Sequence, residues 1–144
     1  SSRGRRMSFV LDPRLARDSH AIGELRLSQL RLMDDARFTW LILVPRIAGA
    51  RELVDLDATD RSQLLEEITL VGRALEVLVC PDKLNIAAIG NVVAQLHVHL
   101  IARFESDALW PDPVWGRGER VVLTNDAREQ QLARLREALK AELS

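Results

Sequence analysis

The chain has 144 residues, of which 47% are hydrophobic and 28% are charged, values that are ordinary for a globular protein of one domain. The formal net charge is −1, which argues against a surface built to hold a nucleic-acid backbone but permits a small phosphorylated ligand in a local pocket. No apolar run approaches the roughly 20 residues that a membrane span needs, and no secretory leader is visible. The single cysteine, Cys80, cannot form an internal disulfide, so a cytoplasmic location is expected.

The N-terminal part of the chain carries few signals of regular structure. Residues 1–6 contain three arginines ahead of Met7, and we interpret them as an expression remnant or a frayed tail. Residues 7–24 contain Pro13, Gly23 and many polar side chains. A mostly irregular lead-in with one short helical turn is therefore expected.

Four short strands are predicted after this lead-in. Residues 30–33 and 39–45 are strand-like runs of a predicted hairpin joined through 34–37, and Pro45 ends the second run because proline has no N–H to donate to a ladder. Residues 84–89 and 95–104 form a second pair of strand-like runs. The Gly90-Asn91 dipeptide between them is a turn signal.

Two helices are predicted around the second pair of strands. Apolar residues recur at three- and four-residue steps from Leu64 to Leu78, the stripe of an amphipathic helix. Asp60 with Gln63 resembles a capping pair at its start, and Pro81 closes it. A second helix near the end of the chain places four leucines on one face: Leu132, Leu135, Leu139 and Leu143. This order of elements predicts an α+β domain in which helices pack on one side of an antiparallel sheet.

The residues best suited to chemistry lie in the last predicted strand. Because alternate side chains of a strand face opposite sides, Gln95, His97 and His99 are predicted to share one face. Three interpretations of the two imidazoles remain open from this pattern: a solvated polar face, a metal site with Glu105 as third ligand, and phosphate chemistry. In the last, a neutral His97 attacks phosphorus while His99 and backbone amides hold the phosphoryl oxygens.

The segment resembles the histidine triad signature, His-φ-His-φ-His-φ-φ with φ apolar, except that Gln95 stands in place of the first histidine. Residues 39–46 are similar to the family's strand that ends in Val/Ile-Pro-Lys/Arg, and Asn85 followed by Gly90 is similar to its approach to the signature. The likeness covers about residues 25–116.

A longer string points to a subgroup of this family. Residues 83–99 together with 110–116 resemble bacterial members that carry glutamine in the first position and are described as diadenosine polyphosphate hydrolase-like. Residues 110–116 include two tryptophans and two prolines, which indicates either a packed corner or an aromatic rim over a nucleotide pocket. The combined string is far more specific than a single His-x-His.

The resemblance implies a fold and an activity. Residues 7–116 would form a HIT-like domain with a five-stranded antiparallel sheet, residues 117–144 a helical extension of it, and two copies a dimer with a continuous sheet. The protein would be a hydrolase or transferase that acts on the α-phosphate of dinucleoside polyphosphates or nucleoside phosphoramidates. Its partner would be a nucleotide, with no nucleic acid and no membrane. No cofactor is required, and magnesium would arrive only with a polyphosphate substrate.

The resemblance also implies roles for single residues. His97 would be the nucleophile that forms a nucleotidyl-histidine, which water then hydrolyses. The backbone carbonyl of Gln95 would accept from the other ring nitrogen of His97, so the change of side chain need not abolish the nucleophile. His99 and the amide of Gln95 would lie near the phosphate. The implied phosphate contacts are Asn85, Gly90 and Asn91, and the implied nucleoside contacts are Leu32, Met33 and Asp34.

Two further departures from the family pattern concern hydrogen-bonding groups. Val92 stands where many relatives have a serine or threonine that assists the leaving group, and Trp40 stands where some have a supporting histidine. Each lost group would contribute about 1–3 kcal/mol if it were buried. These departures suggest narrower specificity or slower turnover, and they keep a nucleotide-binding protein with little activity as an alternative.

Overall fold

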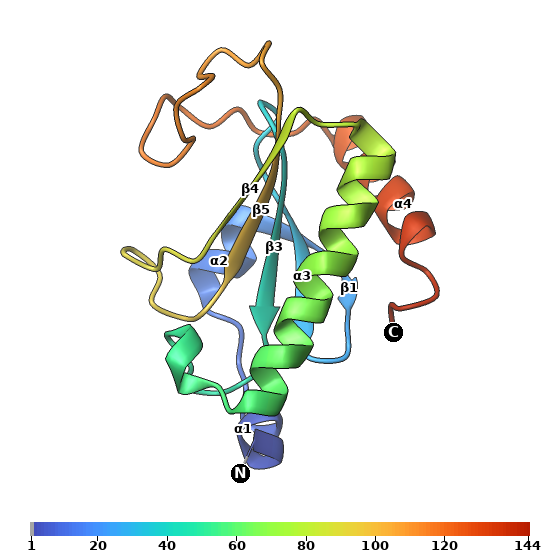
Figure 1. Ribbon diagram of the computed structural model, residues 1–144. Helices are drawn as coiled ribbons and strands as arrows, with labels where there is room; N and C mark the ends of the chain where they lie inside the picture. The colour runs from blue at the N-terminus through green and yellow to red at the C-terminus, as the bar shows by residue number, and fades with distance from the viewer. Residues whose placement is uncertain (1) are drawn as a thin grey trace.

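The computed structural model describes residues 2–144 and contains one five-stranded sheet with the strand order β1-β2-β3-β5-β4 (Figure 1). Each neighbouring pair of strands is antiparallel. The predicted α+β class and antiparallel five-stranded sheet are therefore confirmed. The strands are β1 (Ser19–Glu24), β2 (Ser28–Met33), β3 (Thr39–Pro45), β4 (Lys83–Ala87) and β5 (Val98–Arg103). The helices are α1 (Ser2–Met7), α2 (Pro13–Asp18), α3 (Ala58–Val79) and α4 (Asn125–Ala138), with a 3-10 turn over Leu53–Asp55.

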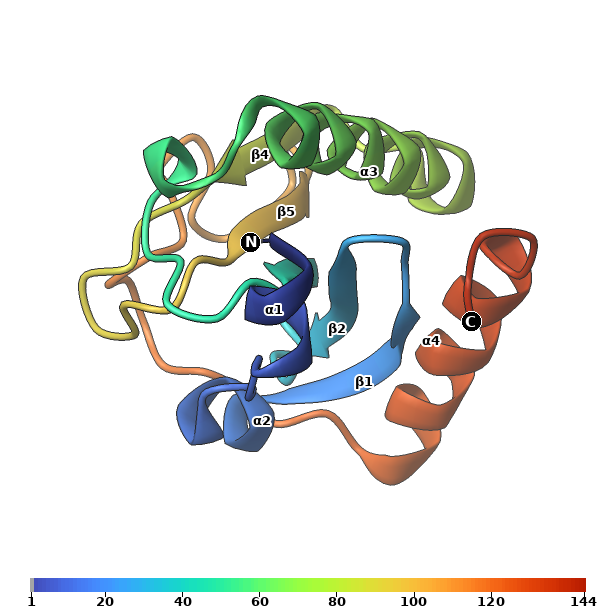
Figure 2. The same cartoon turned by 90° about the horizontal axis from the view of Figure 1, so that it is seen from below.

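Both long helices, α3 and α4, cover the same face of the sheet, as Figure 2 shows. The strand register places Leu41 opposite Leu100, and both side chains are fully buried. They pack in one apolar cluster with Leu64 and Leu75 of α3 and Leu135 of α4. Burial of each such side chain stabilises the fold by about 1.5–3 kcal/mol. No helix within residues 2–144 combines the length and the apolar character that crossing a bilayer requires.

The opposite face of the sheet has its own cover. Trp40 and Ile42 of β3 and Ile101 of β5 form a second apolar cluster with Leu15 of α2 and Val114 of the segment after β5. In Figure 2 the short helix α2 lies outside the sheet, away from α3 and α4. His97 and His99, the predicted catalytic pair, lie on this second side of the sheet.

The N-terminal region is more ordered than its sequence predicts. Residues 2–7 form a helix where a frayed tail was expected, and Arg5 Nε donates to the carbonyl of Ala48 at 3.0 Å. The expected helical turn is α2, which is capped by Asp12. The prediction of an otherwise irregular lead-in was wrong, because residues 19–24 pair with β2 as an edge strand. The strand was missed because it is polar and contains Gly23 beside a bulge.

The long helix begins earlier than its predicted cap. Asp57 is the N-cap, and its side chain accepts from the N–H of Asp60 at 2.8 Å. The predicted pairing of Asp60 with Gln63 was therefore wrong, and Gln63 Nε2 instead donates to Glu67. The helix ends at Val79, shortly before Pro81, as the sequence predicts, and Cys80 between them adopts a left-handed conformation.

Candidate active site

Two histidines lie together where the chain enters β5. The strand begins at Val98, so Gln95 and His97 precede it, whereas the predicted strand began at Gln95. The expected neighbourhood nevertheless forms: the ring centroids of His97 and His99 are 4.9 Å apart. Both side chains are largely buried, with 6% and 5% exposure.

His97 is oriented by the backbone. Its Nδ1 lies 2.7 Å from the carbonyl oxygen of Gln95. Because a carbonyl can only accept, Nδ1 carries the proton, and Nε2 of the neutral ring keeps its lone pair. Within residues 2–144, Nε2 has no hydrogen-bond partner and is not sealed from solvent. This carbonyl contact is the one that the resemblance to the histidine triad implies.

The side chain of Gln95 is engaged elsewhere. Its Oε1 accepts from the N–H of Asp12 at 2.8 Å, and its Nε2 donates to the carbonyl of Val10 at 2.9 Å. The amide thus binds the backbone ahead of α2 at two points. The expectation that this amide serves the phosphate region is not met by the structure, because both of its ends bond the N-terminal segment.

His99 is held by an indole. Trp40 Nε1 donates to His99 Nδ1 at 3.0 Å, and the two ring centroids are 5.6 Å apart. Burial, and secondarily the charge of His97, lowers the pKa of His99 to about 3. His99 is therefore neutral near pH 7. In the sequence, Trp40 was noted only because it replaces a histidine that some relatives have. Strand alternation places Trp40 and Ile42 on the face of the sheet that carries His99, and this could have suggested the contact.

Asn85 faces the same side of the sheet from β4, where it pairs with Ile101. Its Oδ1 accepts from Arg103 Nη1 at 2.9 Å, and Arg103 Nε donates to Asp107 at 2.8 Å. Since Arg103 occupies the oxygen, the amide nitrogen of Asn85 is directed away from it, and this nitrogen has no partner within residues 2–144. Sequence reasoning did not select Arg103, although strand alternation places it on the face of His97 and His99.

The connection between β4 and β5 carries the other predicted phosphate contacts. Gly90 has a φ of 73°, a left-handed conformation that favours glycine. Asn91 is exposed, and Val92 is 82% exposed. Arg14 of α2 donates to the carbonyl of Val92 at 3.0 Å, so the loop is tied to the N-terminal segment.

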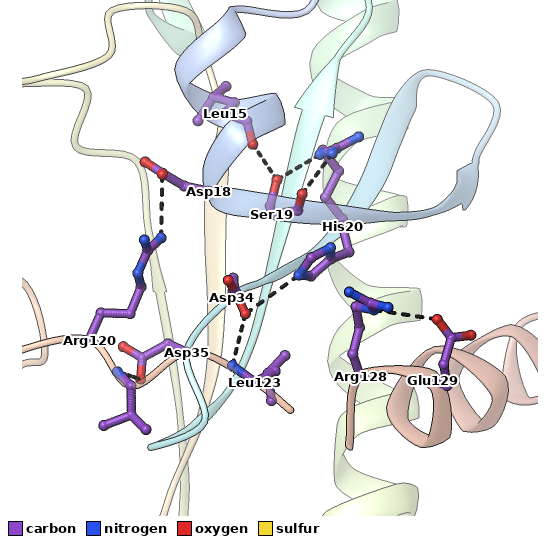
Figure 3. A network of polar contacts seen from close by, with 12 residues as sticks. Leu15, Asp18, Ser19, His20, Asp34, Asp35, Arg120, Leu123, Arg128 and Glu129 are labelled. Atoms are coloured by element: carbon purple, nitrogen blue, oxygen red, sulfur yellow. Dashed lines mark hydrogen bonds and ion pairs between the residues drawn. The ribbon is translucent and has the colours of Figure 1, made fainter. Parts of the chain in front are cut away.

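The three predicted nucleoside contacts occupy different environments. Leu32 is buried in the core beneath α3 and α4, on the face opposite the histidines. Asp34 accepts from the N–H of Leu123 at 3.0 Å and lies 3.5 Å from His20 Nε2, as Figure 3 shows. Met33 alone of the three lines a cavity of about 280 Å³, and its other walls include Asp35, Trp40 and Trp115.

Trp115 packs beside the histidine pair and lines a cavity and a groove next to it. Its ring centroid lies 5.3 Å from that of His99, and it lines both the cavity beside Met33 and a groove of about 430 Å³ beside Asn85. Its Nε1 is sealed from solvent and has no hydrogen-bond partner within residues 2–144. A buried donor without an acceptor costs about 1–3 kcal/mol, which an acceptor on a ligand would recover.

The arrangement does not support the metal interpretation. Among residues 2–144 no three histidine, cysteine, aspartate or glutamate side chains converge as a metal site would require. Glu105 lies after β5, where its backbone N–H donates to Asp82. It does not join His97 and His99 as a third ligand.

Comparisons with known proteins agree on one family. The family model described as the HIT domain matches residues 14–106. A histidine triad protein from Sinorhizobium meliloti is 45% identical, with 93% of this chain and 99% of that chain covered and a TM-score of 0.90. A histidine triad protein from Bradyrhizobium japonicum is also 45% identical, with 90% and 97% covered and a TM-score of 0.88. One from Marinobacter aquaeolei is 40% identical, with 93% and 98% covered and a TM-score of 0.90.

No curated protein gives a significant match. The match to the family model spans more than half of the chain, and the three solved structures cover nearly all of it. The geometry at His97 is of the kind that the triad signature implies. The chain belongs to the HIT domain family, whose members generally bind nucleotides and include hydrolases and transferases.

Proposed function

We propose that this protein is a nucleotide hydrolase or transferase that acts on the α-phosphate of a nucleotidyl substrate through a covalent intermediate on His97. The observation that carries the proposal is the 2.7 Å contact between His97 Nδ1 and the carbonyl of Gln95. That contact leaves the lone pair on Nε2, the atom that attacks. His99 lies beside it as a neutral hydrogen-bond donor.

The reaction has two displacements. In the first, His97 Nε2 forms a bond to the α-phosphorus while the bond from phosphorus to the leaving group breaks, and the leaving group departs with the electron pair. In the second, water attacks the same phosphorus and the bond to Nε2 breaks. Nucleoside monophosphate and a proton are released, and the ring regains its lone pair.

The site lacks a hydroxyl at position 92 that could donate a proton to the leaving group. Val92 has no hydroxyl to donate, and its side chain is 82% exposed. A nucleoside di- or triphosphate can depart as an anion, whereas an amine must first gain a proton. The site therefore favours dinucleoside polyphosphates over nucleoside phosphoramidates as substrates.

We infer how the substrate binds from the cavity beside Met33 and the groove beside Asn85. The cavity lined by Met33, Trp40 and Trp115 accommodates the nucleoside. The amide nitrogen of Asn85 and the backbone around Gly90 contact the phosphates. Magnesium would enter only with a polyphosphate.

The same proposal extends to the assembly and its location. We expect two copies to pair as a homodimer through β4, which lies at one edge of the sheet. We expect the protein to act in the cytoplasm, the compartment that a single free thiol favours.

Substitution of His97 tests this function. We expect His97→Ala to lower turnover of a diadenosine polyphosphate by about 10³-fold or more while the fold is kept, because the nucleophile is lost. Rapid denaturation at alkaline pH, followed by mass spectrometry, should detect a nucleotidyl adduct on His97 of the wild type. His20→Ala is the control, because it also removes a histidine but one that contacts Asp34, in the polar network of Figure 3, and not the pair His97 and His99.

A nucleotide-binding protein with little activity is the second candidate, and the missing hydroxyl at Val92 favours it. Wild-type protein that binds the nucleotide but releases no product would establish this alternative. Full activity in His97→Ala would exclude the covalent route.

A further inference from the structure

The hydrogen bond between Trp40 and His99 is fully inside the protein. Both side chains are buried, at 8% and 5% exposure, and Trp40 Nε1 lies 3.0 Å from His99 Nδ1. Trp40 comes from β3 and His99 from β5, adjacent strands whose register sets Ile42 opposite His99. The two rings therefore meet across one strand pair on the face that carries His97.

An indole can donate a hydrogen bond but cannot accept one through its nitrogen. The bond is made only when His99 Nδ1 has a free lone pair, and a neutral imidazole then carries its proton on Nε2. The opposite tautomer would place two N–H groups against each other in a buried site. Trp40 thus selects one of the two neutral forms of His99.

No other neighbouring group within residues 2–144 forms a hydrogen bond that would favour one tautomer of His99 over the other. Its neighbours include Ile42 on β3, Ala87 on β4, and the rings of Trp115 and His97. His97 is the one titratable group whose charge acts on His99. Nε2 of His99 has no hydrogen-bond partner within residues 2–144.

We propose that Trp40 is a positioning residue that holds His99 in the tautomer protonated on Nε2, so that the two histidines present unlike atoms to the substrate. His97 presents a lone pair for attack on phosphorus, and His99 presents an N–H for a phosphoryl oxygen. The catalytic consequence rests on the proposed function, whereas the tautomer is a property of the free protein. In the other tautomer, His99 would turn a second lone pair toward an anion and repel it.

Nitrogen-15 NMR of the substrate-free protein tests the proposal directly. Long-range proton–nitrogen correlations should show His99 with a protonated Nε2 and an unprotonated Nδ1 as one predominant form at pH 7. A wild-type spectrum with Nδ1 protonated, or with the two tautomers in comparable amounts, would overturn the proposal. This measurement needs no variant and no substrate, so its result is independent of whether the protein turns over a nucleotide.

Two tryptophan variants separate the hydrogen bond from ring packing. Trp40 and Trp115 both pack on His99, but Nε1 of Trp115 makes no hydrogen bond within residues 2–144. Trp40→Phe should shift His99 toward a mixture of tautomers, whereas Trp115→Phe should leave the tautomer unchanged. Equal effects of the two changes, or none from Trp40→Phe, would refute the role of Trp40. If the protein is active, Trp40→Phe should also lower kcat by about 10-fold to 100-fold, less than the loss of about 100-fold to 1,000-fold that complete removal of one transition-state donor causes.

Discussion

At the scale of single residues, the histidines differ because their partners differ. A backbone carbonyl accepts from Nδ1 of His97, and an indole N–H donates to Nδ1 of His99. Two identical side chains, two residues apart, therefore present opposite hydrogen-bonding character at Nε2. Gln95 illustrates the same principle, since its carbonyl serves the site while its side chain holds Val10 and Asp12.

The burial of His99 should make stability depend on pH. The pKa of His99 is about 3 in the folded protein, against the ordinary value of 6.5 that the unfolded chain retains. Below pH 6.5 the unfolded chain binds a proton that the folded protein excludes, so the free energy of unfolding falls by about 1.4 kcal/mol per pH unit toward pH 3. From pH 6.5 to pH 5 the loss should be roughly 2 kcal/mol.

Denaturant unfolding of the wild type and of His99→Gln over this range would measure the effect. The variant has no imidazole at position 99 that the unfolded chain could protonate, so its free energy of unfolding should change less steeply with pH. Parallel pH profiles for the two proteins would contradict the assignment. Burial raises the pKa of Asp35, but its hydrogen bonds with Arg37 outweigh this effect and lower the pKa overall. Because the range from pH 5 to pH 6.5 lies above the ordinary pKa of aspartate, Asp35 adds little to the change in the free energy of unfolding.

At the scale of the elements, α3 is anchored to the turn between β1 and β2 by a buried carboxylate. Glu67 is 2% exposed, and its two oxygens accept from the N–H groups of Leu27 at 2.7 Å and Ser28 at 3.0 Å. Helix periodicity does not predict this position, because Glu67 interrupts the apolar stripe. Only the packed structure shows that the turn supplies two donors at this point.

Glu67→Gln should therefore destabilise the fold. An amide has one oxygen, so its NH2 group would face a backbone donor, and we expect a loss of about 1.5–3 kcal/mol in the free energy of unfolding. Urea denaturation measures this loss, with Glu66→Gln as the matched control because Glu66 is exposed on the same helix. Equal stability of the two variants would show that the buried contact contributes little.

At the scale of the whole molecule, the two edges of the sheet differ. The outer strand β1 is covered by the end of the chain, where Glu24 and Ser144 exchange backbone hydrogen bonds and Arg136 donates to Ile22. At the other edge, no backbone hydrogen bond from the described part of the chain reaches the outer side of β4. An uncovered edge strand is a template for pairing with another strand, which supports the proposed dimer.

Ile86→Lys tests this assembly. Ile86 lies on β4 and is 48% exposed, and near a two-fold axis an added lysine would face its own copy. Analytical ultracentrifugation should find a dimer for the wild type and a monomer for the variant. Val77→Lys, on the exposed side of α3, should remain dimeric. A monomeric wild type would exclude the dimer.

Much of the architecture followed from local patterns in the sequence. Leucine and valine spacing between Leu64 and Leu78 predicted α3, because a helix must bury a stripe with its own period. The short apolar run at residues 39–45, which ends at Pro45, predicted β3, and the string around His97 indicated the family. These features depend on residues close together in the chain, so the sequence by itself determined them.

Tertiary structure decided what depends on distant residues. Strand β1 forms because β2 supplies its hydrogen bonds, and Leu32 and Met33 are divided between opposite faces by the strand's two-residue period. The two partners of the Gln95 side chain are 83 and 85 residues away, that of Nδ1 of His99 is 59 residues away, and the Arg103–Asn85 bond spans 18 residues. Long-range hydrogen bonds depend on the strand register and on loops that no local pattern encodes, and for that reason the sequence identified the histidines while the fold determined what each can do.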